Sequence, residues 1–191
     1  CLSRVCKLAN ALVGLGIKKG DRVATLAWNG YRHLELYYGI SGIGAVCHTI
    51  NPRLSPEQML YIIEHAGDRL LFVDTTFVPI IEKLIPKLPK NLVIIVMASS
   101  DDSSTLSDNY LNYEQLILES SHDIIWPELP ENTAAGLCYT SGTTGNPKGA
   151  LYSHRSTVLH ALTTSLNLGP SLGDGMKVLP VVPLFHVNAW G

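Results

Sequence analysis

Apolar positions along the chain change their spacing repeatedly, and these changes mark alternating helices and strands. Helical spacing opens the sequence, with apolar residues at Leu2, Val5, Leu8, Ala9, Leu12 and Val13. Gly14 and Gly16 then end this helix. The same criteria predict, in order, a strand at Arg22–Trp28, a helix at Tyr31–Ile43, a strand at Ala45–Ile50, a strand at Arg69–Asp74, a helix at Thr76–Ile85 and a buried strand at Leu92–Met97.

A local start signal adds one more helix between the second and third strands. Ser55 can cap it, Pro56 suits the first turn, and Gln58 can reach back as in a capping box, so a helix to about Ala66 is expected. Alternation of this kind predicts an α/β fold in which helices flank a parallel-rich sheet. Polar residues at Ser99–Ser107 predict an exposed loop.

Composition excludes several classes of protein. The 191 residues are 46% hydrophobic and 16% charged, with a net charge of −2, which is too apolar for a disordered chain and too neutral for an electrostatic nucleic-acid binder. The apolar run Leu92–Ala98 is too short to span a bilayer. Four cysteines show no structural zinc spacing, so a cytoplasmic location is expected. Residue 1 is Cys rather than Met, and we expect the numbering to start inside a longer protein.

The candidate chemistry lies at Tyr139–Gly149, directly after a predicted strand at Ala134–Tyr139. The loop Thr140–Gly149 combines four hydroxyl side chains, three glycines and Lys148. Glycines let backbone N–H groups approach phosphate oxygens, hydroxyls donate further hydrogen bonds, and lysine adds positive charge. An ordinary surface turn is the alternative. The order of residues matches neither a Walker A loop nor the dinucleotide fingerprint, which disfavours hydride transfer with a Rossmann cofactor.

Three successive segments resemble signature motifs of the adenylate-forming enzymes, which include acyl-CoA synthetases, luciferases and peptide-synthetase adenylation domains. These segments are Thr140–Gly149, Ser153–Arg155 and Pro183–His186. The resemblance extends over essentially the whole chain. The chain most resembles the medium- and long-chain fatty acyl-CoA synthetases in three segments, which are Ala24–Asn29, Asn51–Leu54 and Phe185–Trp190.

The resemblance implies ATP, Mg²⁺ and CoA as cofactors and co-substrates, and a fatty acid as the second substrate. By similarity, a triphosphate cradle would be formed by Thr140, Ser141, Gly142, Thr143, Thr144 and Gly145. Lys148 would stabilise charge on the β- and γ-phosphates, and Thr140 would also help to hold Mg²⁺. His186 would orient the reacting carboxylate. Val187 would lie against the nucleotide, and Trp190 would gate the acyl tunnel, with a buried core tryptophan as the alternative.

Other chemistry-bearing residues are expected to be structural. His154 and Arg155 should open a helix to Asn167 and fix the loop. Cys47 and Cys138 should pack as small apolar groups within strands. No ligand spacing joins the remaining histidines, which are His33, His48, His65, His122 and His160. Solvated helix faces are expected at Glu35, Glu57, Glu64 and Asp68.

The resemblance also shows which parts of the family pattern have no counterpart in residues 1–191. These are a downstream acidic residue for Mg²⁺, an aspartate for the ribose, and a small C-terminal domain with the adenylation lysine. We therefore expect a partial N-terminal AMP-binding domain that is inactive alone and prone to self-association. Small-molecule substrates are the expected partners, and neither nucleic acid binding nor a transmembrane segment is expected. The candidate assembly is a homodimer of the longer protein to which this chain would belong. An aryl or short-chain acid–CoA ligase and a non-catalytic nucleotide-binding module remain open as alternatives.

Overall fold

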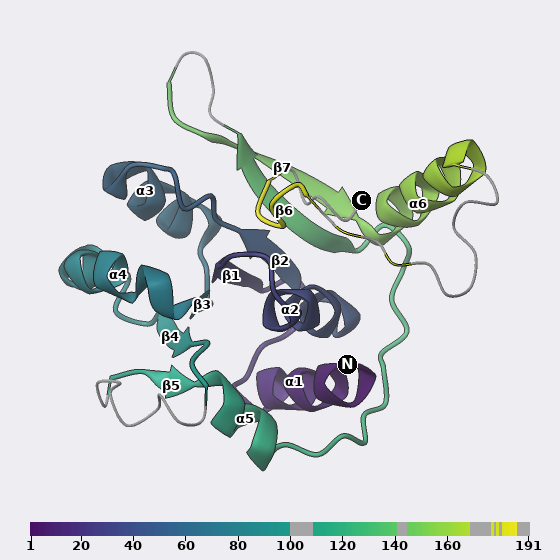
Figure 1. Ribbon diagram of the computed structural model, residues 1–191, viewed down its shortest axis with the longest axis horizontal. Coiled ribbons are helices and arrows are strands. Elements are labelled where there is room, and N and C mark those ends of the chain that lie inside the picture. Colours follow the sequence, from purple (N-terminus) through teal and green to yellow (C-terminus); the bar gives the residue numbers. More distant parts are fainter. Residues whose placement is uncertain (100–108, 141–144, 169–176, 178, 180, 187–191) are drawn as a thin grey trace.

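The structure, a computed structural model, describes residues 1–99, 109–140, 145–168, 177, 179 and 181–186 (Figure 1). Its centre is a seven-stranded sheet with the strand order β5-β4-β3-β1-β2-β6-β7. Neighbouring strands run parallel except for β7, which is antiparallel to β6. The predicted α/β class with a parallel-rich sheet is confirmed. Most of the predicted loop at Ser99–Ser107 lies outside the described residues.

The strands are short and are joined by helical connections. Their bounds are β1 Arg22–Leu26, β2 Val46–Thr49, β3 Leu70–Val73, β4 Val93–Val96, β5 Leu111–Asn112, β6 Ala134–Thr140 and β7 Lys148–Ser153. The helices are α1 Leu2–Gly14, α2 Tyr31–Gly42, α3 Pro56–Ala66, α4 Val78–Leu84, α5 Tyr113–Glu119 and α6 His154–Leu168. Short 3₁₀ turns, η1 Thr75–Phe77 and η2 Ile85–Lys87, flank α4.

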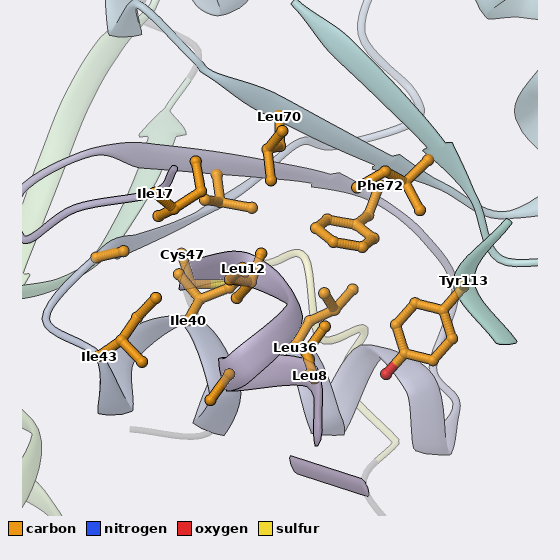
Figure 2. Packing of buried hydrophobic residues seen from close by; sticks show 14 of the residues in the cluster. Leu8, Leu12, Ile17, Leu36, Ile40, Ile43, Cys47, Leu70, Phe72 and Tyr113 are labelled. Carbon is orange, nitrogen blue, oxygen red and sulfur yellow. The ribbon is translucent and has the colours of Figure 1, made fainter. Parts of the chain in front are cut away.

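Alternate residues of the central strands supply two separate cores, one on each face of the sheet. In β3, Leu70 and Phe72 pack with α1, α2 and α5, whereas Leu71 and Val73 pack with α3 and α4. Figure 2 shows the first core, in which Phe72 lies beside Tyr113 of α5. A parallel strand buried on both faces needs apolar residues at every position, which explains the continuous apolar runs in the sequence.

The capping box predicted before α3 is present. The Ser55 hydroxyl accepts the Gln58 N–H, and the Gln58 side chain accepts the Ser55 N–H, at 3.3 and 3.1 Å. At the other end, Gly67 adopts the left-handed conformation, with φ at 65°, and closes the helix. This helix therefore begins and ends at residues whose local chemistry specifies its bounds.

Three elements were not predicted: β5, α5 and β7. The strand β5 has two residues, which is too short for a periodic pattern, and α5 has only seven. The strand β7 begins with Lys148 and Gly149, the last two residues of the segment interpreted as a phosphate loop, and no strand was predicted for the residues that follow. In the part of the chain that the structure describes, no helix is both long and apolar enough to cross a membrane.

Candidate active site

The β6–β7 hairpin fixes the two ends of the candidate phosphate loop. Thr140 ends β6, Lys148 begins β7, and the two residues are directly opposite each other in the strand register. Both are exposed. Gly145 lies between them with φ at 103°, a conformation that side-chain-bearing residues rarely adopt. The predicted cradle residues Ser141, Gly142, Thr143 and Thr144 lie outside the described residues.

The hairpin is tied to the preceding connection at the start of α6. Arg155 contacts the Glu131 carboxylate at 2.6 Å, and the backbone N–H of Arg155 donates to the Glu131 carbonyl. The N–H of His154 donates to the Thr133 carbonyl at 3.0 Å. These residues open α6, as predicted, and their contacts join α6 to the chain that leads into β6.

A second candidate element, the turn at residues 182–186, lies against the end of β1. The Asn29 side chain bridges two of its backbone groups. Asn29 Nδ2 donates to the Val182 carbonyl at 3.2 Å, and Asn29 Oδ1 accepts the Leu184 N–H at 2.7 Å. Both bonds span more than 150 residues of sequence, so one side chain joins distant parts of the chain.

Tyrosine and threonine side chains hold the next part of the turn. The Tyr37 hydroxyl donates to the Leu184 carbonyl, and the Thr49 hydroxyl donates to the Phe185 carbonyl at 3.3 Å. Burial raises the pKa of Tyr37, so its hydroxyl keeps the proton that it donates. The Phe185 ring lies 6.2 Å from the Trp28 ring, centroid to centroid. Leu184 and Phe185 are thereby buried.

His186 closes this turn and is presented to solvent. Its N–H donates to the Pro183 carbonyl at 2.9 Å, while its side chain is exposed. The predicted neighbours Val187 and Trp190 lie outside the described residues. The fold therefore supplies a hydrogen-bonded backbone and an exposed imidazole at this position.

Both candidate elements lie at the same edge of the sheet. Thr49, which bonds the turn, is the last residue of β2, and its register partner in β6 is Cys138. Two residues further along β6, Thr140 ends the strand and begins the candidate phosphate loop. The carboxyl ends of parallel strands are the usual place for ligands in open α/β sheets. Thus the sheet brings Thr140, Lys148 and the turn that carries His186 to the end of the sheet where its parallel strands have their carboxyl ends.

The sequence interpretation did not single out Asn29, Tyr37 or Thr49 as site residues. Asn29 was quoted only as the end of the Ala24–Asn29 resemblance. A usable signal was its position between the end of a strand and a helix start, where polar side chains often support a site. Tyr37 lies within a helix and Thr49 within a strand, and the apolar pattern of both elements indicated a role in core packing only.

His33 braces the turn that carries Trp28 and Asn29. Its Nδ1 lies 3.1 Å from the Trp28 carbonyl, and its Nε2 lies 3.0 Å from the Thr25 hydroxyl. Burial lowers the pKa of His33 to about 4, so the ring is neutral at pH 7. Because a carbonyl only accepts, Nδ1 carries the proton and Nε2 accepts from Thr25.

A second histidine, His48 of β2, lies beside the Tyr139 ring of β6, and its partner corrects the prediction for Asp68. His48 Nδ1 lies 2.8 Å from the Asp68 carboxylate, and both side chains are fully buried. The prediction that Asp68 belongs to a solvated helix face was wrong, because Asp68 follows the glycine that ends α3 and turns into the sheet. Burial raises the pKa of Asp68, and His48 opposes that effect. Nearby, the Tyr139 hydroxyl lies 2.7 Å from His65 Nδ1.

The prediction for Glu35 was also wrong. Glu35 is 1% exposed and accepts from Arg4 Nε at 2.7 Å and from the Tyr113 hydroxyl at 2.8 Å. Arg4 also bonds Glu114, so this cluster joins α1, α2 and α5. Helical periodicity could not reveal it, because the partners lie up to 110 residues apart. Glu57 and Glu64 are exposed, as predicted. Cys47 and Cys138 are buried in β2 and β6, also as predicted.

The donor set at this edge suits a polyphosphate better than a bare metal ion. Lys148 offers positive charge, and Thr140 offers one hydroxyl. Among the residues that the structure describes, no group of three or more His, Cys, Asp or Glu side chains could hold a metal ion. Mg²⁺ commonly retains water and binds through one or two protein groups plus substrate phosphates, and a single hydroxyl beside a candidate phosphate loop is compatible with that mode.

Comparison with known proteins agrees with the fold and the motifs. The chain is 52% identical over 189 residues to a medium-chain-fatty-acid–CoA ligase of Ectopseudomonas oleovorans, covering 98% of this chain and 35% of the relative. It is 50% identical to a 3-methylmercaptopropionyl-CoA ligase of Ruegeria pomeroyi, covering 97% and 34%. A long-chain-fatty-acid–CoA ligase of Thermus thermophilus is 46% identical, with 98% and 33% covered. The chain thus spans about a third of the length of these relatives.

Solved structures give the same result. An anthranilate CoA ligase in complex with anthranoyl-AMP superposes with a TM-score of 0.80 at 27% identity, covering 96% of this chain and 35% of that chain. The sequence profile described as "AMP-binding enzyme" matches residues 1–191, which is the whole chain. The resemblance drawn from the motifs is therefore confirmed: the chain belongs to the AMP-binding enzyme family.

Proposed function

We propose that this chain is the N-terminal part of the large domain of an ATP-dependent fatty-acid–CoA ligase. The observation that carries the proposal is the convergence of two elements at one sheet edge. The hairpin brings Thr140 and Lys148 to the mouth of a phosphate loop, and three side chains hold the turn that ends at His186. A polyphosphate and a carboxylate are the two substrates that such an edge would bring together.

The proposed reaction has two half-reactions. In the first, a carboxylate oxygen of the acid attacks the α-phosphorus of ATP, and the bond to the bridging oxygen breaks to release pyrophosphate. In the second, the CoA thiolate attacks the acyl carbonyl and AMP leaves. Chemistry of this kind depends on positioning and charge neutralisation, and a protein nucleophile is not required.

Named residues would share these tasks. Lys148 would offset the negative charge that builds on the departing pyrophosphate, and the Thr140 hydroxyl would bond the phosphates and their Mg²⁺. His186, exposed on a fixed backbone, would hydrogen-bond a carboxylate oxygen and orient it. Ser141, Gly142, Thr143, Thr144 and Gly145 would line the phosphate cradle. Val187 would contact the nucleotide, and Trp190 would border the acyl site.

Two surface features support the proposal that further chain completes this domain. The strand β7 forms one edge of the sheet, and its Leu151 is 63% exposed. Along α6, one face carries exposed apolar side chains at Val158, Leu159, Leu162 and Leu166. Figure 1 shows α6 extending away from the other helices. Apolar faces of this kind are normally covered in a complete domain.

The remaining parts of the proposal concern surroundings and partners. Four free cysteines, two of them buried, suit a reducing compartment, and we place the ligase in the cytoplasm. Its partners would be ATP, the acid and CoA. A homodimer of the full-length protein is the candidate assembly.

The test is acid-dependent exchange between ATP and labelled pyrophosphate, with the full-length ligase proposed to contain this chain. Medium and long fatty acids should drive exchange, and Lys148→Ala should slow it about 100-fold or more, since it removes charge stabilisation at the reacting phosphates. Lys83→Ala, an exposed lysine of α4, is the matched control and should match the wild type.

The acid panel separates the remaining alternatives. Aryl and short-chain acids belong in it, because an anthranilate CoA ligase shares this fold. Exchange driven mainly by those acids would replace the fatty-acid assignment. Binding of ATP without exchange for any acid would point to a nucleotide-binding module and would contradict the proposed ligase.

A further inference from the structure

The Asn29 side chain bonds a distant turn, although it lies where an asparagine commonly caps a helix. It directly precedes Gly30, the N-cap of α2, and an asparagine at a helix start commonly caps the helix. No side chain caps α2 at Gly30. Instead, both polar atoms of the Asn29 amide bond the backbone of the turn at residues 182–186.

Asn29 and Tyr37 bond backbone groups of this turn, and none of these bonds involves the His186 side chain. Asn29 satisfies the Val182 carbonyl and the Leu184 N–H, while Tyr37 satisfies the Leu184 carbonyl. The His186 side chain remains exposed. A turn anchored at consecutive backbone groups has little freedom to rotate, so the direction of the next side chain is set by the anchor.

We propose that Asn29 is a positioning residue for His186: its amide fixes the 182–186 turn so that the imidazole faces the carboxylate substrate. This inference rests on the proposed ligase function. Asn29 acts through the turn and does not touch substrate. Its loss therefore affects the use of the acid and leaves the binding of ATP at the hairpin loop intact.

The chain contains a matched control at Asn10. The Asn10 Nδ2 atom donates to the Ser121 and Asp123 carbonyls, at 2.8 and 2.9 Å. Like Asn29, it bonds backbone groups that are more than 100 residues away in the sequence. Its partners lie in the segment that follows α5, and Figure 1 shows α1 and α5 apart from the β6–β7 hairpin. An effect caused only by loosened structure would appear in both asparagine variants.

The experiment compares Asn29→Ala, Asn29→Asp and Asn10→Ala in the full-length ligase. Asn29→Ala should raise the KM for the acid and lower kcat of exchange, with a combined loss of about 10- to 100-fold, as expected when a reacting group is misplaced. The Kd for ATP without acid should not change. Asn29→Asp keeps the acceptor for Leu184 but places an oxygen against the Val182 carbonyl, so its loss should be intermediate.

Amide hydrogen exchange provides a readout besides activity. The Leu184 N–H should exchange faster in Asn29→Ala than in the wild type, and Asn10→Ala should leave it protected. Equal kinetic losses in the two alanine variants, or an unchanged Leu184 amide, would overturn the positioning role. Wild-type protein that shows no ATP–pyrophosphate exchange with any acid would instead contradict the proposed function. The failure of the positioning role and the failure of the proposed function are therefore distinguishable.

Discussion

The central strands and the hairpin end of the sheet differ sharply in how they are covered. In β3, Leu71 is fully buried between β1, β4 and the helices α3 and α4. In β7, Leu151 is 63% exposed, and the strand pairs only with β6 among the described residues. The described residues proposed for chemistry lie in the β6–β7 hairpin and in the turn at residues 182–186. Stability and proposed function therefore depend on different parts of one sheet.

Matched leucine truncations would test this comparison most strongly. Leu71→Ala should lower the free energy of unfolding by about 2–5 kcal/mol, because it leaves a cavity in a packed core. Leu151→Ala should change it by no more than about 0.5 kcal/mol, since an exposed side chain leaves no cavity. Urea denaturation of the 191-residue chain, followed by circular dichroism, measures both. Similar losses at the two leucines would show that β7 is packed as firmly as β3.

The next largest effect is a pH dependence that arises from His33 in the packed region. Its folded pKa of about 4 lies below the ordinary value of 6.5, so the unfolded chain binds more protons between these values. Stability should therefore fall as pH decreases from 6.5 to 4, and a shift of this size corresponds to about 3 kcal/mol.

Replacing His33 isolates that contribution from other titrating groups. The stability of His33→Gln, measured by urea denaturation at pH 7 and pH 4.5, should fall less than that of the wild type over this interval. His160→Gln, at an exposed position of α6, should retain the wild-type dependence. A His33→Gln profile parallel to the wild type would place the pH sensitivity elsewhere.

How far the sequence predicts this molecule depends on the distance over which the relevant contacts act. Helix α3 was predicted from its start at Ser55 to about Ala66, because the cap formed by Ser55 and Gln58 acts within a few residues of sequence. The parallel sheet followed from continuous apolar runs. In contrast, β5 and α5 were missed, since they are short and depend on packing by residues such as Tyr113.

The candidate site shows the same division. The candidate phosphate loop could be predicted from sequence because its hydroxyls, glycines and lysine lie within ten consecutive residues. The anchors of the His186 turn could not, because Asn29 and Leu184 are separated by 155 residues and only the folded sheet brings them together. Buried Glu35 and Asp68 were misassigned for the same reason, since their cationic or histidine partners come from other elements.

Two serine caps offer the finest test of the contrast between the packed and hairpin regions. Ser55 caps α3, and at α6 the Ser153 hydroxyl accepts the Ser156 N–H at 3.1 Å while the Ser156 hydroxyl accepts the Ser153 N–H at 3.0 Å. Removing either cap should cost about 1 kcal/mol of helix stability. Because α3 is part of a cooperative core, Ser55→Ala should lower the global free energy of unfolding by that amount.

Helix α6 should respond differently, because its exposed apolar face shows that it gains little from packing. Ser153→Ala should leave global unfolding nearly unchanged and should instead speed amide exchange within α6 about fivefold, as expected for local opening. Hydrogen exchange measured by mass spectrometry distinguishes the two responses. A global loss in Ser153→Ala equal to that in Ser55→Ala would mean that α6 unfolds together with the core, and the two regions would then form a single cooperative unit.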